Sequence, residues 1–118
     1  MKKVEYEEAD WRVCRELREL ALERFCEGIL GEIRDLTEKG GNSHERYREI
    51  YDLIHRRDKQ MAAAFDDVRR SRMHEHLILI CNLGLLTSKE VAGFSETTQV
   101  RVRKFVVNEP DRKSIAGT

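Results

Sequence analysis

The apolar positions of the chain recur at the spacing of α-helices over most of its length. From about residue 7 to residue 39 there is no proline and there are few β-branched residues. The apolar positions of this segment spread as on one long helix, at Trp11, Cys14, Ala21, Leu22, Phe25, Ile29, Ile33 and Leu36. Two glycines follow at 40 and 41, and Asn42 with Glu45 has the spacing of a capping box. We therefore expect a second helix to begin after Asn42 and, because the turn is short, to run antiparallel to the first.

The rest of the chain also favours helices. The second helix has apolar residues three and four positions apart, at Tyr47, Ile50, Tyr51, Ile54, Met61, Ala62, Phe65 and Val68. Residues 77–86 are apolar on every face, which favours a buried third helix over a strand because no second convincing strand can pair with it. Thr87 or Ser88 can cap one short helix and Ser95 another, although residues 100–107 also alternate like a strand.

These elements predict an all-α bundle. It consists of a long antiparallel helical hairpin, a buried third helix and short C-terminal helices. We expect one domain over residues 1–107 and a mobile C-terminal tail over residues 108–118, whose composition is polar and without a period.

Composition narrows the class of protein. The 118 residues include 22 Lys plus Arg and 22 Asp plus Glu, so the formal net charge is zero, and 40% are hydrophobic, which excludes a disordered chain. The three cysteines form no Cys-x-x-Cys pair, which favours a reducing compartment. No segment approaches the roughly 18 apolar residues of a membrane span, and the start lacks the apolar run of a secretory signal. We expect a cytoplasmic protein that does not bind membranes.

Candidate catalytic and metal-binding residues are few. The four histidines lack the spacing of metal ligands, and each cysteine lies on or beside an apolar stretch, which is typical of inert packing residues. We therefore expect no enzyme activity, no metal and no cofactor.

Charged residues interrupt the apolar stripes of both long helices. On a helical wheel that continues to residue 72, Asp58, Arg69 and Arg72 fall in line with the apolar residues of the second helix, and Arg18 does the same on the first. An antiparallel hairpin would bring Arg18 and Arg24 to the level of Asp58. We expect a buried or half-buried ion pair that fixes the packing, with a polar pocket for an anionic ligand as the alternative.

The first helix has a wider apolar surface than one partner would cover. Leu17 and Leu20 lie well off its main stripe, so a second contact is needed. Either the third helix or a second copy of the protein can provide it, and Leu17 and Leu20 are the candidate dimer interface.

One segment resembles a nucleic-acid-binding motif. Residues 89–101 read Lys-Glu-Val-Ala-Gly-Phe-Ser-Glu-Thr-Thr-Gln-Val-Arg, which resembles the Glu-Val-Ala, Gly, hydrophobic, Ser, then Thr and Val run of helix-turn-helix DNA-binding families. The resemblance implies that a short list of residues faces bases or phosphates: Thr98, Gln99, Arg101, Arg103 and Lys104. The zero net charge, and the acidic residues that lie among these basic residues, make the electrostatic contribution to DNA affinity small.

The favoured function is a noncatalytic protein–protein interaction module that homodimerises, with the polar positions Arg18, Asp58 and Arg69 fixing its packing. The alternative is a small helix-turn-helix-like DNA-binding regulator that uses residues 88–104. A DNA-binding experiment distinguishes the two functions, because a DNA-binding protein would be retained on duplex DNA and this retention would weaken steeply with salt.

Overall fold

The computed structural model describes residues 2–106, and over this range it confirms the all-α class. The described elements are α1 (Lys2–Glu38), α2 (Ser43–Phe65), the 3₁₀ turn η1 (Arg70–Arg72), α3 (Met73–Asn82), α4 (Ser88–Val91) and α5 (Glu96–Arg103). Residues 108–118, where a mobile tail is expected, lie outside the described range.

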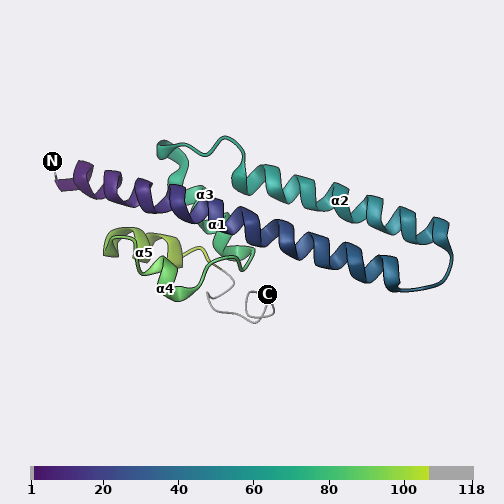
Figure 1. Cartoon of the computed structure of the whole chain (residues 1–118). Coiled ribbons are helices and arrows are strands. Elements are labelled where there is room, and N and C mark those ends of the chain that lie inside the picture. The colour runs from purple at the N-terminus through teal and green to yellow at the C-terminus, as the bar shows by residue number, and fades with distance from the viewer. Residues whose placement is uncertain (1, 107–118) are drawn as a thin grey trace.

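Helices α1 and α2 lie side by side and run in opposite directions (Figure 1). The turn between them places Gly40 and Gly41 at φ values of +83° and +85°, a left-handed conformation that costs glycine little. The side chain of Asn42 then accepts a hydrogen bond from the backbone N–H of Glu45 at 3.1 Å, so Asn42 caps α2 as its position predicts. The molecule is elongated along this hairpin, with extents of 61 × 26 × 21 Å.

The second helix ends earlier than its apolar spacing predicts. Phe65 is its last residue, Asp66 is extended, and Asp67 has a φ of +54°. The helical wheel that places Arg69 and Arg72 in line with the apolar residues of this helix is therefore wrong, because the chain has left the helix and turned before either residue.

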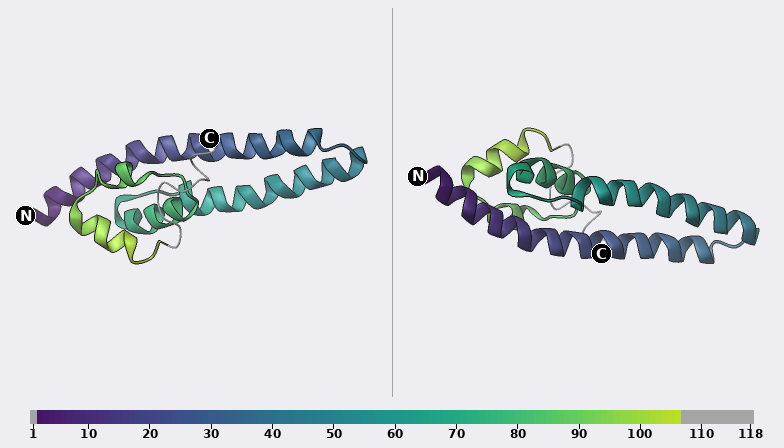
Figure 2. Two further views of the ribbon diagram at one scale, coloured as in Figure 1. Left: turned by 90° about the horizontal axis from the view of Figure 1, so that it is seen from below. Right: turned by 90° about the horizontal axis from the view of Figure 1, so that it is seen from above.

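The three C-terminal helices cover only one end of the hairpin. Figure 2 shows α3, α4 and α5 beside the first half of α1 and the end of α2, while the half of the hairpin that carries the Gly-Gly turn extends beyond them. α5 is helical up to Arg103, so the strand alternative is wrong for residues 100–103, and caps are present at Thr87 and Ser95. The core lies where α3 meets the hairpin, and its buried members are Cys14, Ala21, Phe25, Ala64, Phe65, Met73, Leu77, Ile80, Cys81, Leu85, Leu86, Val91, Phe94 and Val102. Within residues 2–106, no helix has the length and apolar character needed to cross a bilayer.

Candidate functional site

A buried carboxylate attaches α5 to α1. Asp10 is only 3% exposed, and it accepts hydrogen bonds from the backbone N–H of Ser95 at 2.8 Å, from the Ser95 hydroxyl at 2.7 Å and from the Thr98 hydroxyl at 2.5 Å. Because Ser95 is also the N-cap of α5, this one carboxylate fixes both the start of that helix and its position on α1.

A bidentate ion pair attaches α4 in the same way. Arg24 donates to both carboxylate oxygens of Glu90 at 2.8 and 2.9 Å, and to the carbonyl of Leu85 at 2.7 Å. Glu90 also accepts from the backbone N–H of Thr87 at 2.8 Å, which completes a capping box. The hydrogen bonds from Arg24 are the main cause that lowers the pKa of Glu90 below its usual range, so the pair is ionised at neutral pH.

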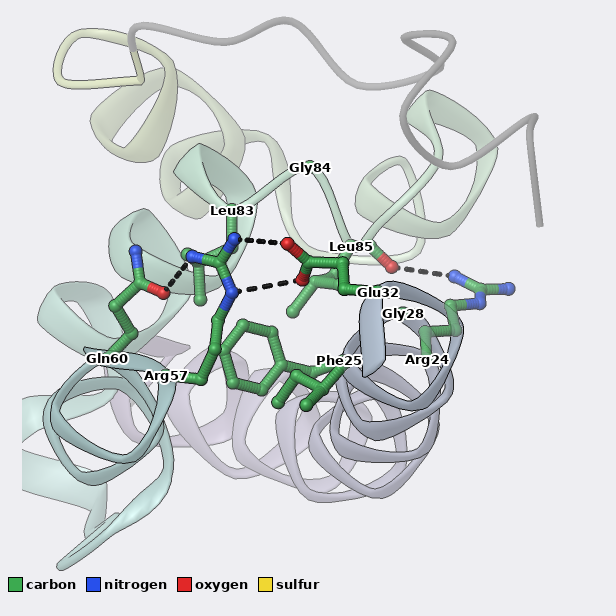
Figure 3. Close-up of a pocket in the computed structure, with 10 residues that line it drawn as sticks. Arg24, Phe25, Gly28, Glu32, Arg57, Gln60, Leu83, Gly84 and Leu85 are labelled. Carbon is green, nitrogen blue, oxygen red and sulfur yellow. Dashed lines mark hydrogen bonds and ion pairs between the residues drawn. The ribbon is translucent and has the colours of Figure 1, made fainter. Parts of the chain in front are cut away.

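A cavity of about 380 Å³ lies beside this pair, where α3 stops covering the hairpin (Figure 3). Its apolar wall comes from Phe25, Ile29, Leu83 and Leu85, and its backbone wall includes Gly28, where an added Cβ would meet no atom within 4 Å. The remaining lining residues are Arg24, Glu32, Arg57, Gln60 and Gly84.

Each charged residue that lines the cavity is held in an ion pair. Arg57 donates to both oxygens of Glu32 at 2.8 and 3.1 Å and to the side-chain oxygen of Gln60 at 2.8 Å. Figure 3 shows this pair bridging the two hairpin helices, with Arg24 on the opposite side of the cavity. The lining residues include no serine, cysteine or histidine.

A second feature is an apolar surface on the uncovered half of the hairpin. Leu30 is 60% exposed, Tyr47 64%, Tyr51 56% and Ile54 41%, and we call these four residues the open face. At about 100° per residue, Leu30 lies roughly 200° from Gly28 on α1 and Tyr51 roughly 180° from Gln60 on α2. Since Gly28 and Gln60 face the cavity beside Leu83, the open face is turned away from the side on which α3 lies.

The structure corrects the predicted ion pair with Asp58. Arg18 donates to the carbonyl of Phe65 at 2.8 and 3.3 Å, and its guanidinium lies 5.9 Å from the Phe65 ring centre. This carbonyl belongs to the last residue of α2, where helices leave acceptors unpaired. Asp58 is exposed on α2, and the second arginine expected at its level, Arg24, bonds Glu90 instead.

The other two polar positions predicted on the stripe lie at the surface. Arg69 pairs with Asp67 at 2.6 Å and Arg72 with Glu75 at 3.0 Å, and all four side chains are exposed. They form a local surface network around η1, not a buried stripe.

The two residues proposed as a dimer interface differ in their exposure. Leu17 packs against the core of its own chain, which supplies the second contact that its position requires. Leu20 is 38% exposed.

The residues implied by the helix-turn-helix resemblance also differ, since some contact their own chain and others are exposed. Thr98 is buried and donates to Asp10, which corrects its assignment to base contact. The Gln99 amide group donates to the carbonyls of Ala92 at 3.3 Å and Phe94 at 2.8 Å. A further three residues at the C-terminal end of α5 are exposed: Arg101, Arg103 and Lys104.

Sequence reasoning missed most of these contacts. The spacing of Thr87 and Glu90 is that of a capping box and could have identified that part of the site. No local signal connects Asp10 with Ser95, which lies 85 residues further along the chain.

Two of the three cysteines are buried in the core. Burial raises the pKa of the Cys14 and Cys81 thiols to about 11, which leaves them protonated at neutral pH. Among the side chains that the structure describes, those of residues 8–106, no three of His, Cys, Asp or Glu gather as metal ligands would.

Comparisons with protein-family models, with curated proteins and with solved structures find no match.

Proposed function

We propose that this chain is a noncatalytic protein–protein interaction module that homodimerises through the open face. The observation that carries the proposal is the set of four large apolar side chains, each at least 41% exposed, on a part of the hairpin that α3, α4 and α5 leave uncovered. Exposed apolar side chains gathered on one part of a surface often mark an interaction site.

The size of the open face fits a partner of similar shape. The exposed parts of its four side chains amount to roughly 400 Å², if a complete tyrosine or aliphatic side chain offers about 200 Å². A stable interface buries about 800 Å² on each partner, so these residues would supply roughly half of it. Partly buried neighbours such as Ile33 and Ile50 can contribute to the rest.

A second copy is the partner that the charge favours. The chain has a formal net charge of zero, so two copies meet without net repulsion. Self-association of two hairpins through an apolar face would also build a four-helix arrangement, which is a common way for a helical hairpin to bury a second side.

The test compares association of the wild type with two matched variants by size-exclusion chromatography with light scattering. The double variant Tyr51→Ser and Ile54→Ser removes apolar area from the open face, and Leu79→Ser removes an exposed leucine from α3. We expect the wild type and the Leu79 variant to elute with twice the monomer mass of 13.9 kDa and the double variant to elute as a monomer. An unchanged dimer in the double variant would contradict the assignment of the face. Dissociation by Leu20→Ser instead would place the interface on the surface of α1 around Leu20.

The DNA-binding alternative is tested in the same samples. It draws on the exposed Arg101, Arg103 and Lys104 of α5. A rise in mass with a random DNA duplex that disappears as salt is added would favour this alternative over the interaction module.

A further inference from the structure

The cavity beside Gly28 offers a binding site that is separate from the open face. We propose that it binds a compact, uncharged apolar molecule. This site lies on the α3 side of the hairpin, so the inference does not depend on the proposed dimer.

The size and lining of the cavity support this class of ligand. Its volume of about 380 Å³ falls in the range of small-molecule pockets. Phe25, Ile29, Leu83 and Leu85 converge on it from α1 and from the segment after α3. Gly84, between the two leucines, has a φ of +74°, a conformation that turns the chain sharply at this wall.

The charged groups at the rim argue against an ionic ligand. Arg57 is paired through two hydrogen bonds with Glu32, and Arg24 is paired through two with Glu90. An anion that took over one of these arginines would leave its carboxylate without that ion pair, and a cation that took over a carboxylate would do the same to the guanidinium. An uncharged molecule leaves both pairs intact.

Gly28 is the residue of α1 that lines the cavity without a side chain. Glycine inside a helix is unfavourable relative to alanine, and here a Cβ would meet no atom of the protein within 4 Å. A side chain at Gly28 would therefore enter open space at the cavity wall, and no other helix approaches closely enough to require glycine there. Gly31 has equally open surroundings but does not line the cavity, so it provides a matched control.

The experiment titrates the protein with the neutral fluorescent probe N-phenyl-1-naphthylamine and with its anionic relative 8-anilinonaphthalene-1-sulfonate. Three proteins are compared: the wild type, Gly28→Leu, which places a side chain in the cavity, and Gly31→Leu, which places one outside it. Thermal unfolding of each variant confirms that it is folded.

We expect the neutral probe to bind the wild type saturably at one site per chain and more tightly than the anionic probe. Affinity should fall by about tenfold or more in Gly28→Leu, because the new side chain occupies the space of the ligand, and stay within about twofold in Gly31→Leu. Equal binding to both leucine variants, or no saturable binding to the wild type, would overturn the proposal. Tighter binding of the anionic probe would show that the arginines, not the apolar wall, recognise the ligand. The Tyr51→Ser and Ile54→Ser variant should bind the neutral probe as the wild type does, which separates this site from the open face.

Discussion

Replacing Asp10 with alanine should destabilise the protein far more than any other loss of a single acid from the hairpin. The residue is 3% exposed, and its carboxylate accepts three hydrogen bonds: from the backbone N–H of Ser95, from the Ser95 hydroxyl and from the Thr98 hydroxyl. A hydrogen bond to a charged group contributes about 1.5–3 kcal/mol, and a buried donor left without a partner costs about 1–3 kcal/mol. The three bonds share one acceptor group and are not additive, so we expect a total loss of about 4 kcal/mol.

Urea unfolding followed by circular dichroism measures this loss directly. A change of about 4 kcal/mol is a large part of the 5–15 kcal/mol that stabilises a typical domain, and it should lower the Tm by roughly 10–20 °C. Asp58→Ala is the matched control, since this exposed acid lies on α2 and should change stability by less than about 0.5 kcal/mol. Protein concentration is held fixed, because dimerisation would contribute to the measured stability.

Hydrogen exchange locates the effect. With Asp10 replaced, the backbone amides of α5 should lose protection before those of α1 and α3, because the carboxylate holds the start of α5. A loss of less than about 1 kcal/mol, or an equal loss in Asp58→Ala, would refute the reasoning.

Three further predictions follow from the same structure. The pKa of Glu90 is lowered in the folded state, so the stability that its ionised form provides is present above its ordinary pKa of 4.5 and is lost as the pH falls through the folded value. The difference in unfolding free energy between the wild type and Glu90→Gln should therefore shrink in acid. A difference that stays constant with pH would count against the ion pair. Gly40→Ala should lower the stability by about 1–2 kcal/mol because φ is +83° there, and a neutral effect in thermal unfolding would argue against this turn. Cys26, which is partly exposed, should react with a thiol reagent before the buried Cys14 and Cys81, whose pKa values are raised to about 11. Mass spectrometry of the labelled peptides identifies the order of reaction. Early labelling of either buried thiol would contradict this prediction.

The features that could be predicted from the sequence are those that depend on neighbours along the chain. The caps at Asn42, Thr87 and Ser95 each involve a residue three positions away, so their signals are local. The helical class likewise follows from the repeat of apolar positions, which belongs to each segment by itself.

The features that could not be predicted depend on tertiary contacts. Val68 and Arg69 continue the helical spacing of α2, and no glycine or proline signals that the helix ends at Phe65. Tyr47 and Ile54 share this spacing with buried residues, yet both are exposed, because α1 covers only part of a wide apolar surface. Which part it covers is set by the packing of α3 on the hairpin, which no single segment encodes.

Analytical ultracentrifugation of the wild-type chain over a wide concentration series tests the central claim most directly. We predict a reversible equilibrium in which the mass approaches twice 13.9 kDa at high concentration and falls toward 13.9 kDa on dilution. A constant mass of one chain at every concentration would contradict the assignment of the open face as a dimer interface.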